Sequence, residues 1–222
     1  MKRANVVDGL AAVLFDMDGL LVDTEPLWLE TETDVMARLG ATWSEADQEA
    51  LLGGSMDRTV RYLLDKATRP QAPRTVAQWM LDGMLDRVRA GRVVVRPGVR
   101  ELLAEVSAAG LPYALVTSSQ RVFADAVLAA TGMTFPVIVS AEDVTASKPD
   151  PEPYLLAAKL LTVAPESCVA LEDSPNGVAS AAAAGCRVVA VPSLVPIPPA
   201  PGRVVMTSLA GVDLAMLREI GA

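Results

Sequence analysis

The feature that most constrains the fold is the alternation of short, continuously apolar runs with helix-like segments. Apolar runs of this length are typical of parallel strands that are buried on both faces of a sheet. They lie at Ala11–Phe15, Tyr113–Val116, Val137–Val139, Cys168–Leu171, Val188–Val191 and Val204–Met206. The helix-like segments lie at Val99–Ala109, Arg121–Ala130, Pro153–Leu161, Val178–Ala184 and Leu209–Ile220. This order predicts an α/β fold whose parallel sheet is covered by helices on both faces.

The alternation stops between Pro26 and Gly91, where no segment has the pattern of a strand. Helical patterns instead cover residues 27–39, 44–52, 56–65 and 75–90. A helical block inserted after the first strand of an α/β sheet indicates a second, smaller domain. We therefore predict a core domain of residues 1–22 and 96–222 and an all-helical cap domain of residues 23–95.

Charge and histidine content exclude several classes of function. The chain has 27 acidic and 19 basic residues, a net charge of −8, and no basic cluster longer than Lys2-Arg3. Nucleic acid is therefore not an expected partner, since such proteins carry a basic surface. The chain contains no histidine, which removes Ser-His-Asp catalysis and histidine-ligated zinc. Any chemistry must use carboxylates, hydroxyls, lysine and arginine.

The sequence contains no recognisable signal for secretion or for membrane insertion. Asp8 interrupts the apolar start, and no run of 18 apolar residues occurs. Cys168 and Cys186 lie apart in the sequence and are expected to be buried, reduced thiols. We expect a cytoplasmic protein without a membrane partner and, by default, a monomer.

Polar motifs follow several of the predicted strands. Asp16-Met17-Asp18-Gly19 follows the first strand, Thr117-Ser118-Ser119 follows Val116, and Glu172-Asp173-Ser174 follows Leu171, while Lys148 precedes a helix. Each motif alone also fits an ordinary turn, loop or helix cap. Ligands of parallel sheets bind beyond the carboxyl ends of the strands. Together these residues offer cation ligands, a nucleophile, an anion site and a lysine, which indicates phosphoryl transfer.

At these motifs the chain resembles the haloacid dehalogenase superfamily, and within it the β-phosphoglucomutase-like phosphatases that carry a helical cap after the first motif. The matching segments are Asp16–Glu25, Thr117-Ser118, Lys148-Pro149 and Glu172–Gly177. Their order and the helical insert match as well, so the resemblance covers nearly the whole chain. It implies a Rossmann-like parallel-sheet core domain with an inserted all-helical cap domain.

The resemblance also implies a role for each matching residue. Asp16 is expected to attack phosphorus and form an aspartyl-phosphate, and Asp18 to act as acid and then as base. The implied catalytic set is Asp16, Asp18, Thr117 and Lys148. The implied contacts to the phosphate are Met17, Asp18, Thr117, Ser118 and Lys148. One Mg²⁺ is expected on Asp16, on the backbone carbonyl of Asp18 and on Asp173, with Glu172 close by or bound through water.

The implied function is a Mg²⁺-dependent phosphatase that hydrolyses small phosphomonoesters, with sugar phosphates favoured. A sugar-phosphate mutase is the alternative. The mutases' hinge histidine aligns with Trp28 and their cap arginine with Met56, although Arg58 could partly substitute. Asp18 argues against a dehalogenase, and the helical insert argues against a phospho-accepting receiver domain. A non-catalytic module that binds a phosphorylated ligand is less favoured.

Substrate choice is expected to lie in the cap. The Gly53-Gly54-Ser55 turn is the candidate segment, because glycines permit close backbone approach, and Arg58 follows it. The same turn fits an ordinary helix–helix connection equally well. Asp23–Glu25 and Val93–Arg96 are the expected hinges of a closing cap.

Overall fold

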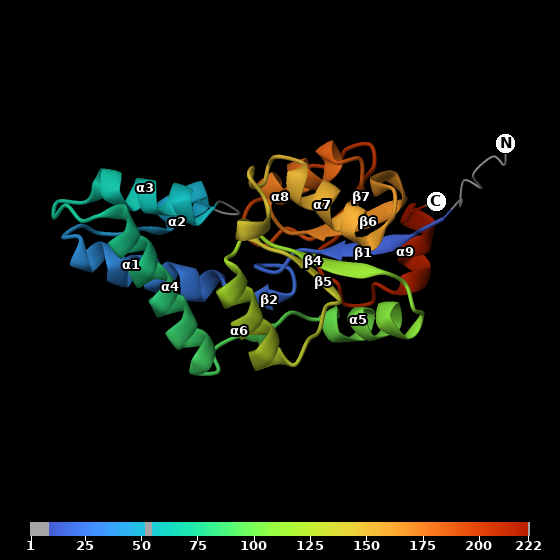
Figure 1. The fold of residues 1–222 in the computed structure, drawn as a ribbon, viewed down its shortest axis with the longest axis horizontal. Coiled ribbons are helices and arrows are strands. Elements are labelled where there is room, and N and C mark those ends of the chain that lie inside the picture. Colours follow the sequence, from blue (N-terminus) through green and yellow to red (C-terminus); the bar gives the residue numbers. More distant parts are fainter. Residues whose placement is uncertain (1–8, 52–54, 222) are drawn as a thin grey trace.

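The computed structural model describes residues 9–51 and 55–221, and its main feature is a parallel sheet of six strands. The strand order is β5-β4-β1-β6-β7-β8, so β1 lies inside the sheet between β4 and β6 (Figure 1). The strands are β1 (Ala12–Phe15), β4 (Tyr113–Val116), β5 (Val137–Val139), β6 (Cys168–Glu172), β7 (Arg187–Ala190) and β8 (Arg203–Val205). The predicted α/β fold is confirmed.

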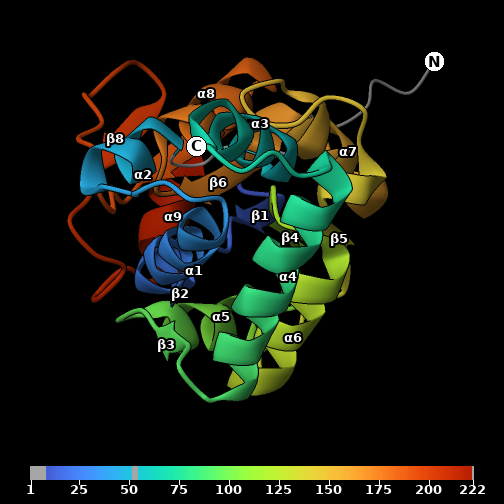
Figure 2. The same cartoon turned by 90° about the vertical axis from the view of Figure 1, so that its left-hand side faces the viewer.

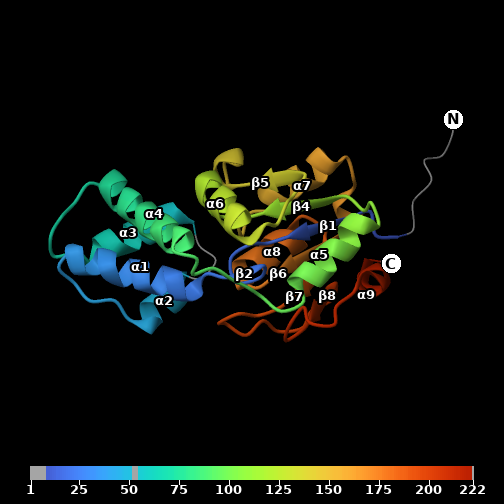
Figure 3. The same cartoon turned by 90° about the horizontal axis from the view of Figure 1, so that it is seen from below.

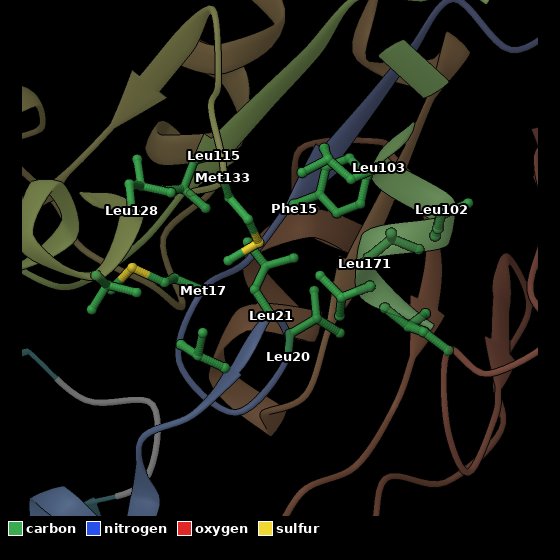
Figure 4. Packing of buried hydrophobic residues seen from close by; sticks show 14 of the residues in the cluster. Phe15, Met17, Leu20, Leu21, Leu102, Leu103, Leu115, Leu128, Met133 and Leu171 are labelled. Carbon is green, nitrogen blue, oxygen red and sulfur yellow. The ribbon is translucent and has the colours of Figure 1, made fainter. Parts of the chain in front are cut away.

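The two faces of the sheet carry side chains of different size, because successive residues of a strand point in opposite directions. Phe15, Leu115 and Leu171 pack together on one face, as Figure 4 shows. That face is covered by α5 (Val99–Ala108), α6 (Arg121–Thr131) and α9 (Leu214–Gly221).

The opposite face presents mainly small residues, including Ala12, Ala114 and Ala170. It is covered by α7 (Glu152–Leu161) and α8 (Pro175–Ala183). The small side chains let these alanine-containing helices pack close to the strands. Cys168 and Cys186 belong to this cluster and are both free and buried.

The four helices described between Asp23 and Val94 form a second body with its own apolar core (Figures 1 and 3). They are α1 (Glu25–Arg38), α2 (Glu45–Leu51), α3 (Met56–Lys66) and α4 (Pro73–Arg89). The apolar core of this body lies between α1, α3 and α4 and consists of Val35, Met36, Leu39, Val60, Leu63, Val76 and Met80. The predicted helical cap is therefore present, and α4 packs against α6 of the core (Figure 2). The domain boundaries stay a prediction.

A short antiparallel ribbon joins the two chain crossings between sheet and cap. It consists of β2 (Val22–Asp23) and β3 (Val94–Val95). The Arg96 N–H also donates to the Leu21 carbonyl at 3.0 Å. The two crossings are thus hydrogen-bonded to each other. Two-residue strands are too short to show a periodic pattern, so the sequence did not predict them.

Helices α8 and α9 begin furthest from the residues that the sequence indicated. Helix α8 begins at Pro175 instead of Val178, because the Ser174 hydroxyl accepts from the Gly177 N–H at 3.1 Å and proline suits the first helical turn. Helix α9 begins at Leu214 instead of Leu209, and its first turn is closed by the Met216 N–H, which donates to Asp213 Oδ1 at 2.8 Å. Within the described residues, no helix combines the length and apolar character that a bilayer crossing requires.

Two glycines with positive φ allow a matched test of the packing at the start of α5. A Cβ on Gly98 (φ 84°) would fall 2.1 Å from the Leu209 carbonyl oxygen, whereas a Cβ on Gly91 (φ 73°) would meet nothing within 4 Å. Gly91→Ala should cost about 1–2 kcal/mol of unfolding free energy, for the backbone conformation alone. Gly98→Ala should cost a further ~1–3 kcal/mol, because the backbone at Leu209, in the segment before α9, must shift. Urea unfolding of both variants measures the difference, and equal losses would contradict this account.

Candidate active site

Polar residues from three neighbouring strands meet at the carboxyl end of the sheet. Asp16 follows β1, Thr117 follows β4, and Glu172 ends β6. The Asp16 N–H donates to the Leu171 carbonyl at 3.1 Å, which continues the pairing of β1 with β6 beyond the end of β1. The sheet register therefore brings these residues together, as the parallel topology predicts.

Lys148 lies at the centre of the site, and its ammonium group donates three hydrogen bonds. Its Nζ donates to Asp16 Oδ1 at 2.6 Å, to Glu172 Oε1 at 2.6 Å and to the Val116 carbonyl at 2.8 Å. Burial disfavours the positive charge, but the carboxylates of Asp16 and Glu172 outweigh it and raise the pKa of Lys148 above its ordinary value. Lys148 is therefore a buried cation that three acceptors hold in place.

Glu172 is fully buried, and both of its oxygens accept hydrogen bonds from the protein. Oε1 accepts from Lys148 and from the Tyr154 hydroxyl, the latter at 2.7 Å, and Oε2 accepts from the Asp173 N–H at 3.1 Å. A Cβ on Gly177 would fall 1.8 Å from Glu172 Oε1, so only glycine fits at that point of α8. These contacts describe Glu172 as a positioning residue for Lys148.

The buried carboxylates of Asp16, Glu172 and Asp173 form a compact cluster. Each offers an oxygen within 4.8 Å of the others, and Asp16 Oδ2 is buried without a hydrogen-bond partner among the described residues. Burial raises the pKa of Asp16 despite Lys148, and burial together with the neighbouring carboxylates raises the pKa of Asp173. The single positive charge of Lys148 does not neutralise the negative charge of three carboxylates. A hard divalent cation with oxygen ligands fits this donor set.

Gly19 lets the loop after β1 approach Asp173. Its φ is 82°, and a Cβ there would fall 1.9 Å from Asp173 Oδ2. The same Asp173 oxygen accepts from the Ser193 hydroxyl at 2.6 Å. Glycine thus allows the first motif and the end of β6 to face a common ligand.

Asp18 is held apart from this cluster, at the junction with the cap. Oδ1 accepts from the Thr24 hydroxyl at 2.6 Å and from Trp28 Nε1 at 3.4 Å, and Oδ2 accepts from the Ser119 hydroxyl at 2.7 Å. Thr24 lies in a predicted hinge and Ser119 in a predicted anion motif, but the sequence analysis gave neither of them a contact with Asp18. Only the fold shows that both hydroxyls reach this carboxylate.

The remaining predicted core residues differ in what they present to a ligand. The Met17 side chain is fully buried in the apolar core, so a phosphate contact at this position has to come from its backbone. Thr117 is buried, and its hydroxyl accepts from the Ser119 N–H at 3.0 Å. The Ser118 hydroxyl is buried, has no partner among the described residues, and lines the cleft.

The predicted specificity residues of the cap lie elsewhere than expected. Arg58 is exposed and donates to the Ala50 carbonyl at 2.7 Å, and Ser55 is the N-cap of α3, so neither lines the cleft. Both side chains are engaged at helix ends instead of in the cleft: Arg58 donates near the end of α2, and the Ser55 hydroxyl accepts at the start of α3. Gly53 and Gly54 lie outside the described residues.

A cleft separates the carboxylate cluster from the cap. On the core side, Asp16, Asp18, Ser118, Lys148 and Asp173 line it. On the cap side, the lining includes Glu25, Trp28, Glu32, Gln48, Met56 and Thr59, which we call the cap wall. Trp28 also packs on Phe123 of the core, with ring centroids 5.9 Å apart.

The cap wall contains two carboxyls that the sequence analysis did not expect in the cleft: Glu25 was placed in a hinge, and Glu32 was not singled out. Glu25 accepts from Gln48 Nε2 at 3.1 Å, and Glu32, 3% exposed, accepts from Trp43 Nε1 at 2.9 Å. Burial, with a smaller effect from Asp18, raises the pKa of Glu25 to about 7, and burial raises that of Glu32 to about 8. Their signal was the i, i+7 spacing, which places both on one face of α1.

Comparisons with known proteins agree with this fold and site. The family of haloacid dehalogenase-like hydrolases matches residues 13–191. Hexitol phosphatase B of Escherichia coli is 37% identical over 188 residues, which cover 83% of this chain and 84% of that protein. The crystal structure of CbbY from Rhodobacter sphaeroides in complex with phosphate has a TM-score of 0.85 at 30% identity, covering 94% of this chain and 99% of that one. A β-phosphoglucomutase structure from Clostridium difficile, with a TM-score of 0.83 at 22% identity and coverage of 96% and 97%, shares the fold.

The family match spans most of the chain, and the sequence motifs lie within it. The protein therefore belongs to the haloacid dehalogenase-like hydrolases, as its motifs predict, and it is an enzyme. The predicted membership and enzyme class are confirmed.

The raised pKa of Glu32 makes stability depend on pH. A carboxyl whose pKa is raised on folding stabilises the folded state below its unfolded pKa of 4.5, and this contribution is lost as pH rises towards about 8. Glu32→Gln removes this loss, so the variant should gain ~1–3 kcal/mol relative to wild type between about pH 5 and about pH 8.5. Urea unfolding at both pH values measures the gain. Glu49→Gln, an exposed change on α2, should show none, and a flat difference for Glu32→Gln would contradict the prediction.

Proposed function

We propose that this enzyme is a phosphatase that hydrolyses small phosphomonoesters, sugar phosphates in particular, through an aspartyl-phosphate on Asp16. The single observation that carries the proposal is the Asp16 carboxylate at the cleft. One of its oxygens is bound by Lys148 at 2.6 Å, while the other is buried without a partner among the described residues. The fixed oxygen orients the group, and the unpartnered oxygen is available to attack phosphorus. The phosphatase name of the Escherichia coli relative supports this assignment.

A Mg²⁺ ion fits the carboxylate cluster, because the donors are hard oxygens and the acids exceed the single buried lysine. Asp16, Asp173 and the backbone carbonyl of Asp18 are the proposed ligands, with Glu172 behind them. When bound, the cation supplies positive charge to the transferring phosphoryl group. The same charge and Lys148 favour the ionised form of Asp16, whose pKa is otherwise raised by burial.

The chain's own residues account for both half-reactions. Asp16 forms a bond to phosphorus while the bond from phosphorus to the ester oxygen breaks, and Asp18 gives its proton to that oxygen. Asp18 then takes a proton from a water molecule. The oxygen of that water bonds to phosphorus while the bond from phosphorus to Asp16 breaks, which releases phosphate and restores the Asp16 carboxylate. Thr24 and Ser119, bonded to Asp18, orient it at the side of the cleft where the leaving group must lie.

Hydrolysis is favoured over transfer between sugar hydroxyls by the residue at the hinge. Trp28 occupies this position and donates to Asp18 from Nε1. An indole nitrogen is a donor only and does not accept a proton, so Trp28 does not replace the histidine of the mutases. Conversion of β-glucose 1-phosphate to glucose 6-phosphate would overturn the assignment as a phosphatase.

Removal of the nucleophile tests the aspartyl-phosphate route. Asp16→Asn keeps the shape of the side chain but not its nucleophilic charge, so kcat for phosphate release from p-nitrophenyl phosphate should fall by about 10³-fold or more. Asp65→Asn, an exposed change on α3, is the matched control and should keep wild-type kcat. Wild-type turnover in Asp16→Asn would exclude the route, and no release from any phosphomonoester would exclude the function.

Metal binding can be measured without turnover. Mg²⁺ at 100 times its Kd should raise the Tm of the wild type by about 5–10 °C, because it binds the folded state alone. Asp173→Asn should lose this shift and raise the Tm of the metal-free protein, since it removes one of three clustered acids. Differential scanning calorimetry measures both effects. An undiminished Mg²⁺ shift in Asp173→Asn would contradict the ligand assignment.

A further inference from the structure

The three hydrogen-bond donors of the Lys148 ammonium group are all in use within the protein. They go to Asp16 Oδ1 and Glu172 Oε1, each at 2.6 Å, and to the Val116 carbonyl at 2.8 Å. An ammonium group has three donors, so these bonds leave no proton of Lys148 for a phosphoryl oxygen. The contact between Lys148 and phosphate that the sequence motifs predict therefore requires that one of the three bonds is given up.

Glu172 is the acceptor that can release Lys148 and still keep a hydrogen bond at the same oxygen. Its Oε1 accepts a second bond, from the Tyr154 hydroxyl at 2.7 Å. The bond from Lys148 to Asp16 has to persist during the reaction, because it orients the carboxylate that is proposed to attack phosphorus. The bond to the Val116 carbonyl anchors the ammonium group to the end of β4. Release from Glu172 leaves both of these contacts intact.

Tyr154 contacts both members of the ion pair between Lys148 and Glu172. It lies in the first turn of α7 and is completely buried. Its hydroxyl donates to the carboxylate of Glu172, and the Lys148 Nζ lies over its ring, 5.1 Å from the ring centroid. At this distance the face of an aromatic ring attracts a cation. The ring therefore keeps the ammonium group close to the carboxylate that the hydroxyl holds.

The hydroxyl of Tyr154 matters most in the state in which Lys148 has left Glu172. A buried acceptor that loses its last donor costs more than a hydrogen bond normally contributes, above all when it is charged. Glu172 is fully buried. Without the Tyr154 hydroxyl, Lys148 would be the remaining one of the two donors described for Oε1. Loss of the hydroxyl should therefore penalise the phosphate complex more than the free enzyme.

We propose that Tyr154 is a positioning residue for phosphoryl transfer: its hydroxyl holds Glu172 while Lys148 turns one N–H from that carboxylate to the phosphoryl group. The step exchanges one hydrogen bond for another and transfers no proton. The inference rests on the proposed phosphatase function and adds a residue to it. The sequence analysis singled out Lys148 but gave Tyr154 no role, because an aromatic residue in a helix also fits an ordinary place in the core.

The first test removes the hydroxyl and keeps the ring. In Tyr154→Phe, the Ki of inorganic phosphate, measured against hydrolysis of p-nitrophenyl phosphate with Mg²⁺, should rise about tenfold, and kcat should fall about tenfold. The reason is that the bound state now leaves a buried carboxylate oxygen without this donor. Tyr113→Phe is the matched control and should keep both constants. Tyr113 begins β4, at the end of the strand away from the site, and packs on Phe135 with ring centroids 5.5 Å apart.

Metal binding distinguishes a positioning role from a general loss of structure. The rise in Tm that Mg²⁺ produces should persist in Tyr154→Phe, because the proposed ligands Asp16, Asp173 and the Asp18 carbonyl are unchanged. Differential scanning calorimetry measures this rise, and circular dichroism confirms that the variant is folded. A lost Mg²⁺ shift would mean that the substitution disturbs the whole carboxylate cluster, and it would overturn the assignment.

A double-mutant cycle tests whether Tyr154 acts through Glu172. Glu172→Gln replaces the buried carboxylate with a neutral amide of similar shape, whose oxygen loses less than a charged one when a donor leaves. In this background Tyr154→Phe should change the Ki of phosphate by no more than about threefold, because coupled residues are not additive. A change of about tenfold in both backgrounds would show that the hydroxyl does not act through Glu172, and would overturn the proposal.

The outcomes separate this inference from the proposed function. If the wild-type enzyme releases phosphate from no phosphomonoester, the phosphatase function is wrong and the inference falls with it. If the wild type is active and folded Tyr154→Phe matches it in both kcat and the Ki of phosphate, the inference is wrong and the function stands. A weaker phosphate complex with an unchanged Mg²⁺ shift supports both.

Discussion

The site depends on one buried ammonium group, that of Lys148. Asp16 and Glu172 end neighbouring parallel strands, and without a cation between them they would be two buried carboxylates in close contact. Lys148 donates to both, and its third proton goes to the last carbonyl of β4. One side chain thus ties the loop before α7 to the ends of β1, β4 and β6. Because removing one partner of a buried ion pair leaves the other unpaired, the four elements keep a single arrangement.

The cap and core are joined both by backbone and by the site itself. The β2–β3 ribbon pairs the two crossings of the chain. Asp18, in the first core motif, accepts from Thr24 and from Trp28 at the start of the cap. The proposed acid and base of the reaction therefore depends on the position of α1. The same helix carries Glu25 and Glu32, which line the cleft opposite the carboxylate cluster.

The cap wall contains two acids that the fold holds at a cost in stability. Relatives with TM-scores above 0.8 keep the same architecture at 30% identity or less. Glu25 and Glu32 are acids whose pKa values are raised by burial, which costs folding free energy near neutral pH. Such a cost is common where a site is built for a ligand instead of for stability.

The sequence by itself determined the order of strands and helices along the chain, the helical insert, the acids that follow strands, Asp16 and Asp173 among them, and the lysine before a helix, Lys148. These follow from local patterns, since apolar runs define strands and parallel strands carry ligands at their carboxyl ends. Only the tertiary structure decided which side chains line the cap wall. Glu25 is held by Gln48 of α2 and Glu32 by Trp43 in the loop before α2, whereas Arg58 donates to a carbonyl near the end of α2. Side-chain direction in a helical bundle depends on packing between helices distant in sequence, which no local pattern records.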